Sequence, residues 1–387
     1  MKSKVSETAR FRHTPSPRAG KVKLGYLSAD FHQHATAYLM ADLFEHHDRS
    51  KFEVLAYSYG RDDGSDMRKR LSRAFNRFVD IRALPHLEAA RRIHEDGIDI
   101  LIDLKGYTTH ARTEILAYRP APIQVNYLGY PGTMGGDFVD YIIVDGLIAS
   151  MSEQQFYSER LVHLPDCYQP NDTKRQISEP TPSRSDCDLP EQGFVFCCFN
   201  NSYKINPTFF DIWMRLLKAA PDSVLWLLKS SELVEKNLQR EAAARGIDRE
   251  RLIFAPRRPL SEHLARHRQA SLFLDTMPCS AHTTASDAVW AGLPVLTCMG
   301  QTFAGRVAGS LLRAAGMPEL IASSTQEYEA TALGLVRKPK QLAGYRQKLE
   351  QNRLRMPLFD IDRFTKNIEA AFRSMWETWS AGRAPTS

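Results

Sequence analysis

The sequence predicts an α/β protein composed of two doubly wound domains. Short apolar runs alternate with longer stretches of helical periodicity, which is typical of a parallel sheet covered by helices on both faces. The alternation stops at residues 166–192, a polar stretch rich in proline, and then begins again. A length of 387 residues also suits two domains. Because such sheets bind ligands at the carboxyl ends of their strands, we expect a binding cleft between the facing loops of the two domains.

The first half of the chain contains the strands of the first predicted domain, at 21–165. Each run is almost continuously apolar, as strands buried on both faces are. The runs cover residues 21–29, 52–58, 99–106, 123–129 and 141–145. Helical spacing between them predicts helices over 36–47 and 87–97.

The second half repeats the pattern after the predicted linker at 166–192. Strands are expected at 193–200, 223–229, 251–256, 271–275 and 294–298. Helices are expected at 207–219 and 232–246, from His282 onward, and through much of 303–350. We therefore assign a second domain to 193–360 and a closing helix to 361–382.

Composition excludes several classes of protein. Residues 1–20 are basic and contain proline and serine, so we expect a disordered tail; they lack the apolar core of a secretory signal. No stretch approaches the roughly 18 apolar residues of a membrane span. A net charge of +6 is mild and does not indicate nucleic-acid binding. The six cysteines form no C-x-x-C pair, which indicates a reducing, cytoplasmic location and neither disulfides nor a zinc site.

A histidine and two threonines stand where a helix begins after the strand at 271–275. Pro278 prevents an earlier start, and His282, Thr283 and Thr284 precede apolar residues at near-helical spacing. A helix N-terminus offers unpaired N–H groups and a positive dipole end, to which these side chains add donors. The combination suits a pyrophosphate. The alternative is ordinary capping by threonine beside a structural histidine.

Asp287 follows one helical turn later, where a carboxylate could accept hydrogen bonds from ribose hydroxyls. A second strand–turn–helix corner, at 196–207, carries Lys204, and a lysine there can neutralise a diphosphate leaving group. The alternative for Lys204 is a solvated surface lysine.

A third corner, at 255–270, places His263 and Arg266 on one helical face at spacing i and i+3. An imidazole can stack on a nucleobase, and an arginine can hold a phosphate with its planar fork. The alternative is a basic, solvated helix. Three such corners at strand ends of one domain favour a nucleotide site over three unrelated surface features.

Four segments together resemble the catalytic region of the O-linked N-acetylglucosaminyltransferases, the SPINDLY-like glycosyltransferase family 41. They are "RPAPIQVNYLGYPGTMG" (119–135), "FNNSYKINP" (199–207), "SVLWLLK" (223–229) and "HTTASDAVWAGLPV" (282–295). The resemblance covers roughly residues 21–380. It implies the GT-B fold, two Rossmann-like domains with the donor bound in the second. It also implies an inverting, metal-independent transfer of N-acetylglucosamine from UDP-N-acetylglucosamine to protein serine or threonine hydroxyls.

The resemblance implies specific roles for residues that match the family's motifs. His282, Thr283 and Thr284 match the pyrophosphate-binding trio, and Asp287 matches the ribose-binding acid. Lys204 matches the lysine that steadies the β-phosphate, and Cys279 matches a cysteine beside the N-acetyl group. His263 and Arg266 match the uracil-stacking histidine and its arginine neighbour. The full implied donor site is Asn201, Lys204, Arg258, Leu260, His263, Arg266, Cys279, His282, Thr283, Thr284 and Asp287.

The sequence departs from the family pattern in several places. Asn201 stands where relatives often have glutamine, and Arg258-Pro259-Leu260 replaces Ala-Pro-Lys, so the lysine near uracil is absent. The tetratricopeptide array that usually precedes the catalytic region is not in this sequence, nor is the long insert of animal members. The means of selecting acceptor proteins is therefore not evident.

The chemistry expected is attack of an acceptor hydroxyl on the anomeric carbon, with a nucleoside diphosphate leaving. We expect Lys204 and the 282–284 corner to stabilise the leaving group in place of a metal, and we expect no cofactor. The Asp-x-Asp patterns at 186–188 and 360–362 fall in the linker and near the last helix, so we assign them no metal.

The catalytic base is open from sequence alone. His34 follows the first strand and matches a histidine proposed as the base; it could instead bind substrate or order its loop. His32 is the weaker neighbour, and His94 falls inside a helix and is expected to be structural. Tyr130, Pro131, Gly132 and Thr133 form a turn at a strand end that either lines the sugar or acceptor pocket or is a structural turn.

Other functions remain possible within the same reading. The donor could be UDP-glucose, with asparagine as acceptor, or GDP-fucose, with serine or threonine as acceptor. The chain could also be a non-catalytic nucleotide-sugar-binding protein, although Lys204 together with His282 argues against it. A nucleotide-sugar epimerase would need a catalytic carboxylate set that we do not find. The expected partners are UDP-N-acetylglucosamine or UDP and an acceptor protein or peptide, with no nucleic acid and no membrane.

Overall fold

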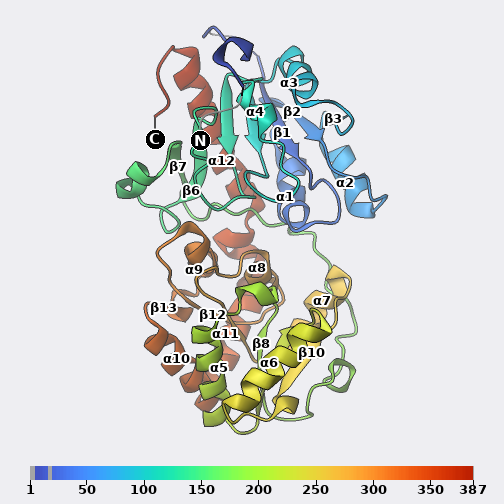
Figure 1. The fold of residues 1–387 in the computed structure, drawn as a ribbon, viewed down its shortest axis with the longest axis vertical. Coiled ribbons are helices and arrows are strands. Elements are labelled where there is room, and N and C mark those ends of the chain that lie inside the picture. The colour runs from blue at the N-terminus through green and yellow to red at the C-terminus, as the bar shows by residue number, and fades with distance from the viewer. Residues whose placement is uncertain (1–4, 16–19, 387) are drawn as a thin grey trace. The chain divides into compact units, whose positions relative to one another are not determined.

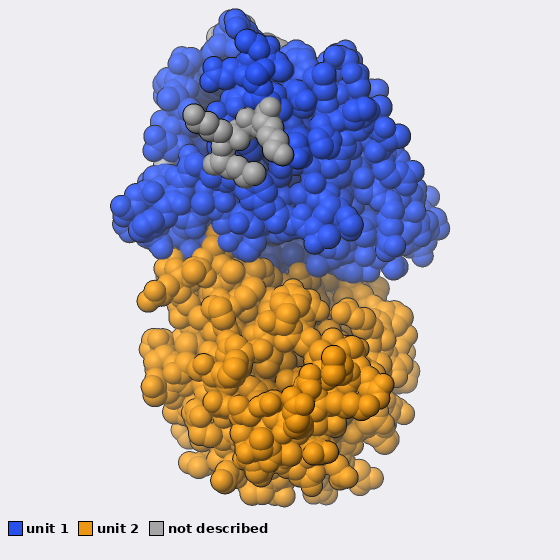
Figure 2. All heavy atoms as spheres, viewed as in Figure 1, with its two compact units in different colours: residues 1–173, 357–387 blue, residues 174–356 orange. Residues whose placement is uncertain are grey.

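The computed structural model describes residues 5–15 and 20–386, and the chain divides into two compact units (Figure 2). Unit 1 comprises residues 1–173 and 357–387, and unit 2 comprises residues 174–356. The stretch expected as a linker is therefore shared between the units. The final helix and residues 357–360, which the sequence assigns elsewhere, both belong to unit 1.

Unit 1 is built on a seven-stranded sheet in which every pairing is parallel (Figure 1). The strand order is β3-β2-β1-β4-β5-β6-β7. The strands are β1 (Val22–Ser28), β2 (Phe52–Ser58), β3 (Arg77–Asp80), β4 (Ile100–Asp103), β5 (Ile123–Asn126), β6 (Tyr141–Asp145) and β7 (Arg160–Leu164). The central strands are buried along almost their whole length, which is why most of their residues are apolar.

Helices connect and cover this sheet. They are α1 (Ala35–His46), α2 (Asp66–Ala74), α3 (His86–Glu95), α4 (Glu114–Ala117) and the C-terminal α12 (Ile361–Ser380), with short 3₁₀ turns at Glu7–Ala9, Met151–Phe156 and Pro357–Phe359. Helix α12 packs against α1, and its buried Glu369 accepts hydrogen bonds from His47 Nδ1 at 2.9 Å and from the Asp48 N–H at 2.8 Å. The C-terminal helix is therefore an integral part of unit 1.

Unit 2 has a six-stranded sheet, again parallel throughout, in the order β10-β9-β8-β11-β12-β13. Its strands are β8 (Phe194–Cys198), β9 (Ser223–Leu228), β10 (Leu252–Ala255), β11 (Leu272–Leu274), β12 (Val295–Cys298) and β13 (Ile321–Ala322). Its helices are α5 (Pro207–Ala219), α6 (Glu232–Ala244), α7 (Leu260–Arg266), α8 (Thr283–Trp290), α9 (Phe303–Ala314), α10 (Thr325–Arg337) and α11 (Pro339–Asn352). Shorter 3₁₀ turns lie at Ser185–Cys187, Ser202–Lys204, Arg249–Arg251, His267–Gln269, Pro318–Leu320 and Arg353–Arg355.

The prediction of an α/β chain with two Rossmann-like sheets is confirmed, and every strand expected from an apolar run is present. Three strands were missed: β3, β7 and β13. β3 and β7 are the two edges of their sheet, and each leaves residues exposed, so neither has a continuous apolar run. β13 has only two residues within a stretch of helical periodicity.

Strand order places a switch point in each sheet. The order reverses between β1 and β4 in unit 1 and between β8 and β11 in unit 2. Loops after two such neighbouring strands leave the sheet in opposite directions, which opens a crevice at their carboxyl ends. Candidate residues should therefore follow β1 and β4, or β8 and β11.

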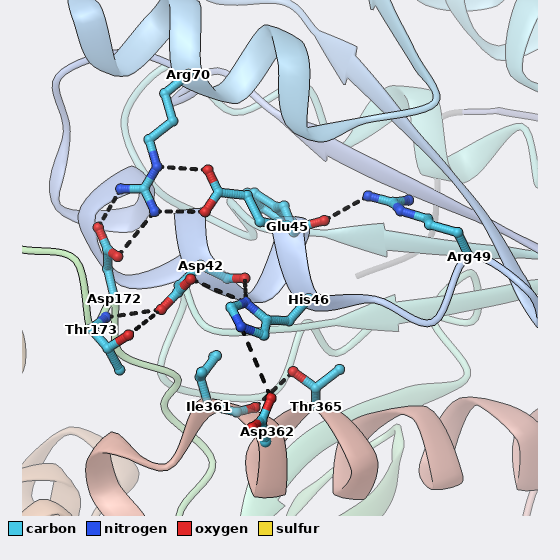
Figure 3. Close-up of polar contacts among 11 residues, drawn as sticks. Asp42, Glu45, His46, Arg49, Arg70, Asp172, Thr173, Ile361, Asp362 and Thr365 are labelled. Atoms are coloured by element: carbon cyan, nitrogen blue, oxygen red, sulfur yellow. Dashed lines mark hydrogen bonds and ion pairs between the residues drawn. The ribbon is translucent and has the colours of Figure 1, made fainter. Parts of the chain in front are cut away.

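The segments by which the chain leaves and re-enters unit 1 are anchored by polar contacts (Figure 3). Arg70 of α2 bonds both Glu45, at 2.8 Å, and Asp172, at 2.6 Å. The buried Asp42 of α1 accepts hydrogen bonds from the N–H and hydroxyl of Thr173. These contacts explain why the stretch up to Thr173 belongs to unit 1 although its composition is that of a linker.

Part of the expected N-terminal tail is ordered against unit 1. Residues 1–4 and 16–19 lie outside the described residues. In the described part, the Phe11 N–H donates to Tyr118 O at 2.8 Å, and the Phe11 ring stacks on His94 of α3 with centroids 4.3 Å apart. Arg10 pairs with Asp137 at 3.0 Å. Residues 5–15 thus pack on the domain, where composition predicts disorder.

Among the helices of the described ranges, none has the length and apolarity required to cross a bilayer.

Candidate active site

A buried carboxylate organises the switch point of unit 2. Asp275 directly follows β11, and its Oδ1 accepts the N–H groups of Thr276 and Ala281, both at 2.7 Å. Its Oδ2 accepts the Thr297 hydroxyl of β12 at 2.7 Å. Burial raises the pKa of Asp275, and the three donors and Lys204 counteract that rise. Asp275 therefore fixes the loop 276–281 against the sheet.

Asn200 extends this network to the start of α8. It follows β8, and its Nδ2 donates to Asp275 Oδ1 at 3.2 Å and to Thr276 Oγ1 at 2.8 Å. Its Oδ1 accepts a hydrogen bond from the hydroxyl of Thr284. The turn after β8 and the first turn of α8 are thereby held together across the switch point.

The three residues that sequence placed at a helix start do stand there. His282 is the N-cap of α8, and Thr283 and Thr284 are its first two residues; all three are partly exposed. The first helical hydrogen bonds are donated by the N–H groups of Ala285 and Ser286 to His282 O. The N–H groups of Thr283 and Thr284 lie before that ladder, so they have the position of helix-terminal anion donors.

His282 is neutral and its tautomer is defined by one contact. Burial and the charge of Lys204 lower the pKa of His282 to about 3. Its Nε2 lies 3.3 Å from Ala304 O, and a carbonyl can only accept, so Nε2 carries the proton. Nδ1 then carries a lone pair. The ring is thus positioned by unit 2 itself. The anion donors of this corner are the Thr283 hydroxyl, the backbone N–H groups and Lys204, because the Thr284 hydroxyl already donates to Asn200.

Lys204 reaches the same corner from the other strand. It ends the short turn Ser202–Lys204 after β8, and its Nζ donates to Ser280 O at 2.7 Å, two residues before His282. Ser280 is fixed in turn by hydrogen bonds from its N–H and hydroxyl to Ala304 O. A half-buried ammonium group therefore lies beside the N-terminus of α8.

His263 and Arg266 of α7 lie together as their spacing predicts, but the arginine is used internally. The Arg266 guanidinium is buried and donates to His263 Nδ1, from Nε at 3.0 Å and Nη2 at 2.6 Å, and to Pro256 O at 2.5 Å. It also packs over the Phe199 ring, 4.9 Å from the centroid. Burial, His267 and Arg266 hold the pKa of His263 well below its usual range. Arg266 therefore orients a neutral imidazole, and the guanidinium of Arg266 already donates its hydrogen bonds within unit 2.

Asp287 lies in the second turn of α8 and is buried. Its Oδ1 is 2.7 Å from Nη1 of Arg175, a residue of the supposed linker. Burial raises the pKa of Asp287 to about 6, and the Arg175 charge opposes that rise. The carboxylate therefore has a protein counter-ion that the sequence analysis did not anticipate.

The remaining expected donor-site residues are more exposed. Asn201 is exposed beside Tyr203, Arg258 is exposed and pairs with Glu262 at 3.3 Å, and Leu260 is the first residue of α7. Cys279 is half-buried in the loop that Asp275 fixes.

The switch point of unit 1 carries a second polar cluster. Asp30, after β1, forms a buried ion pair with Lys105, after β4, at 2.8 Å. His34 is the N-cap of α1, and its Nδ1 accepts the Thr36 N–H at 3.2 Å while lying 3.4 Å from Asp30 Oδ2. Burial lowers the pKa of His34, against the opposing charge of Asp30. His34 is therefore a partly exposed, neutral imidazole beside a buried ion pair.

The turn at 130–133 is held by the protein. The Thr133 hydroxyl donates to the buried Glu159 at 2.6 Å, and the Gly132 carbonyl accepts from Asn126 Nδ2 at 3.0 Å. Tyr130 is half-exposed, and its ring contacts that of Tyr107 edge to face at 5.6 Å. All four residues of the turn are half-exposed. Because the Thr133 hydroxyl is engaged by Glu159 and Gly132 has no side chain, Tyr130 and Pro131 are the members whose side chains are best placed to touch a ligand.

Five residues of these clusters escaped the sequence analysis: Asp30, Lys105, Arg175, Asn200 and Asp275. Four of them lie one or two residues after β1, β4, β8 or β11, the strands beside the two switch points, and polar residues at those ends were the available signal. Within the described ranges, no group of three or more histidine, cysteine or acidic side chains is arranged to hold a metal ion.

Comparison with known proteins places this geometry in a family. The profile of glycosyl transferase family 41 matches residues 2–180 and 176–368. The chain is 39% identical over 371 residues to the probable UDP-N-acetylglucosamine–peptide N-acetylglucosaminyltransferase SEC of Arabidopsis thaliana. It is 30% identical over 474 aligned residues to the UDP-N-acetylglucosamine–peptide N-acetylglucosaminyltransferase of Caenorhabditis elegans. Each alignment covers 94% of this chain but only 38% and 41%, respectively, of those proteins.

Solved structures agree on the fold. A mutant O-GlcNAc transferase of Thermobaculum terrenum aligns with a TM-score of 0.88 and 32% identity, over 96% of this chain and 71% of that one. Anabaena HepE in complex with UDP and glucose aligns with a TM-score of 0.62 over 91% of this chain and 100% of that one, at 12% identity, a likeness of fold alone.

We predict that Asp275→Asn destabilises unit 2 by about 2–4 kcal/mol, because an amide nitrogen would then face buried donors that now bond a carboxylate. Asp248→Asn is the matched control, since Asp248 is exposed and accepts one backbone N–H of a 3₁₀ turn; its cost should be below about 1 kcal/mol. Urea unfolding of the three proteins measures both values. Equal stability of Asp275→Asn and the parent would show that the network does not fix this corner.

Proposed function

The chain belongs to glycosyl transferase family 41, and on that premise we propose that it transfers N-acetylglucosamine from UDP-N-acetylglucosamine to serine or threonine hydroxyls of polypeptides. The observation that carries the proposal is the convergence of Lys204, Thr283 and Thr284 at the N-terminus of α8. Relatives named for this activity are 30–39% identical to the chain. Because the chain spans about two fifths of their length, we propose the activity for these 387 residues.

Stabilisation of the leaving group is the main catalytic contribution in this proposal. As the glycosidic bond breaks, negative charge grows on the β-phosphate of UDP. An ammonium group, the Thr283 hydroxyl and the N–H groups at a helix start can take up that charge without rearranging, because Asp275 and Asn200 already fix the turns that carry them. We propose that these groups replace a metal ion and that no cofactor is needed.

The rest of the donor would lie along the same edge of unit 2. We propose that the His263 ring, oriented by Arg266, stacks on uracil, and that Asp287 accepts the ribose hydroxyls. The backbone at Arg258 and Leu260 would contact the base in place of the missing lysine. Cys279 would lie beside the N-acetyl group, and Asn201 would contact the donor from the turn after β8.

His34 is better suited to donate a hydrogen bond than to remove a proton. In the tautomer that accepts the Thr36 N–H at Nδ1, the Nε2 atom carries the hydrogen. The lowered pKa of His34 keeps the ring in this neutral form at pH 7. We therefore propose that His34 donates Nε2–H to the substrate and that a donor phosphate oxygen accepts the hydroxyl proton. Tyr130 and Pro131 would contribute to the acceptor surface of unit 1.

A donor panel tests the proposed function. We expect binding and slow hydrolysis of UDP-N-acetylglucosamine, weaker use of UDP-glucose, and no use of GDP-fucose, measured by calorimetry and by release of the nucleoside diphosphate. Transfer to a serine- or threonine-containing peptide pool, detected as a gain of one N-acetylhexosamine by mass spectrometry, completes the assignment. Preference for GDP-fucose would refute the donor, and binding without turnover would favour a non-catalytic protein.

Lys204→Ala should lower kcat by about 100- to 1,000-fold, since it removes a charged donor aimed at the leaving group. KM should change less, because the helix terminus and the ribose contact remain. Lys236→Ala is the control: Lys236 is an exposed lysine of α6 in the same unit, paired with Glu232. A parent-like kcat in folded Lys204→Ala would remove our account of leaving-group stabilisation.

His34→Gln separates the two roles of His34. A glutamine side chain can place an N–H near the Nε2 position but cannot act as a base near pH 7. If His34 is a donor, His34→Gln should retain kcat/KM within about tenfold of the parent, whereas His34→Ala should lose more. The pH–rate profile of His34→Gln should keep the parent's acidic limb. Loss of that limb, with Gln as inactive as Ala, would identify His34 as the base.

A further inference from the structure

We propose that Arg175 is a positioning residue for ribose recognition: it holds the carboxylate of Asp287 ionised and oriented, and so sets how strongly the site distinguishes a ribonucleotide from its deoxy forms. The inference rests on the proposed function, because it assumes that Asp287 meets the ribose. Nothing in the sequence pattern marks Arg175, which lies in a stretch with the composition of a linker.

Arg175 is fixed by contacts of three kinds, all within unit 2. Its guanidinium Nη1 bonds Asp287 Oδ1 at 2.7 Å, and the side chain is 1% exposed. Its Cζ lies 5.1 Å from the ring centroid of Trp290, a cation–π distance. Its backbone carbonyl accepts the indole N–H of Trp290 at 3.2 Å. The guanidinium cannot rotate away from Asp287 without breaking both the ion pair and the ring contact, and the carbonyl contact fixes the main chain from which the side chain extends.

The ion pair leaves the carboxylate able to serve a ligand. An ionised carboxylate can accept about four hydrogen bonds over its two oxygens, so one bond from Arg175 to Oδ1 leaves capacity for ribose hydroxyls. Arg175 Nη2 also lies 3.5 Å from Ser286 Oγ, which fixes the plane of the guanidinium. The orientation of the carboxylate is therefore set before any ligand arrives.

The charge state of Asp287 depends on the same contact. Burial raises its pKa to about 6, and Arg175 is the group that opposes that rise. Without Arg175, the pKa of the buried carboxyl would rise further, so that a larger share of it would be protonated and would present a hydroxyl donor to one side. A protonated Asp287 accepts ribose hydroxyls poorly, so the loss of Arg175 should appear as a loss of hydroxyl discrimination in particular.

A matched control is available at the same indole. Arg353 Cζ lies 5.2 Å from the Trp290 centroid, almost the same distance as Arg175. No contact between Arg353 and Asp287 occurs among the hydrogen bonds and ion pairs of the described residues. Arg353→Met therefore removes a stacked guanidinium without removing the ion pair.

The experiment measures Kd for UDP, 2′-deoxy-UDP and 3′-deoxy-UDP by calorimetry at pH 7.5 in the parent, Arg175→Met, Arg353→Met and Asp287→Asn. In the parent, UDP should bind at least tenfold tighter than one of the deoxy forms, as a hydrogen bond to a charged group implies. In Arg175→Met the ratio should fall below about threefold, and in Arg353→Met it should stay at the parent value. The double variant Arg175→Met/Asp287→Asn, measured in the same way, should show the same ratio as Asp287→Asn alone.

The outcomes separate the inference from the proposed function. A parent that does not bind UDP refutes the proposed function and the inference with it. A parent that binds UDP with a high ratio, retained in folded Arg175→Met, overturns the inference alone. Should Arg175→Met not fold, Arg175→Lys takes its place, because lysine keeps the charge but lacks the planar fork; its ratio should fall about threefold, and a parent-like ratio would again overturn the inference.

Discussion

The site of unit 2 depends on one buried carboxylate. Asp275 binds the loop that follows it, the hydroxyl of the next strand and the amide of Asn200, so three separate segments share one pair of oxygens. The donors at the start of α8 and the Lys204 ammonium belong to the turns so joined. Preorganisation of this kind matters because stabilising charge at a leaving group is effective only if the donors need not move when the charge appears.

Much of the fold follows from patterns in the sequence. Central parallel strands are buried on both faces, so each is a largely apolar run that can be recognised alone. The edge strands β3 and β7 have one exposed side, and their residues are therefore mixed, which removes the signal. Compact units cannot be assigned by composition either: the polar, proline-rich stretch near Asp172 and Arg175 is tied into both units by buried charges that no local pattern reveals.

The candidate site was predictable as a set of positions but not as a set of roles. His282, Thr283 and Thr284 lie at a helix start, and His263 lies beside Arg266, as their spacing indicates. Which donors remain for a ligand depends on partners distant in sequence. Pro256 and His263 engage the Arg266 fork, Ala304 fixes the proton on His282, and Thr36 occupies the lone pair of His34. Tautomers and counter-ions are tertiary properties, so a single sequence does not contain them.

The return of the chain to unit 1 through α12 has a consequence for biosynthesis. Unit 2 is continuous in sequence, whereas in unit 1 Glu369 of α12 accepts the hydrogen bonds of His47 and Asp48, more than 300 residues earlier. During translation, the part of unit 1 that precedes unit 2 is therefore made before α12 and lacks these contacts until α12 is made. A chain released before α12 is made would contain all of unit 2 but an incomplete unit 1, in which the surface of α1 that packs against α12 is uncovered. Such exposed apolar surface is what chaperones and proteases recognise.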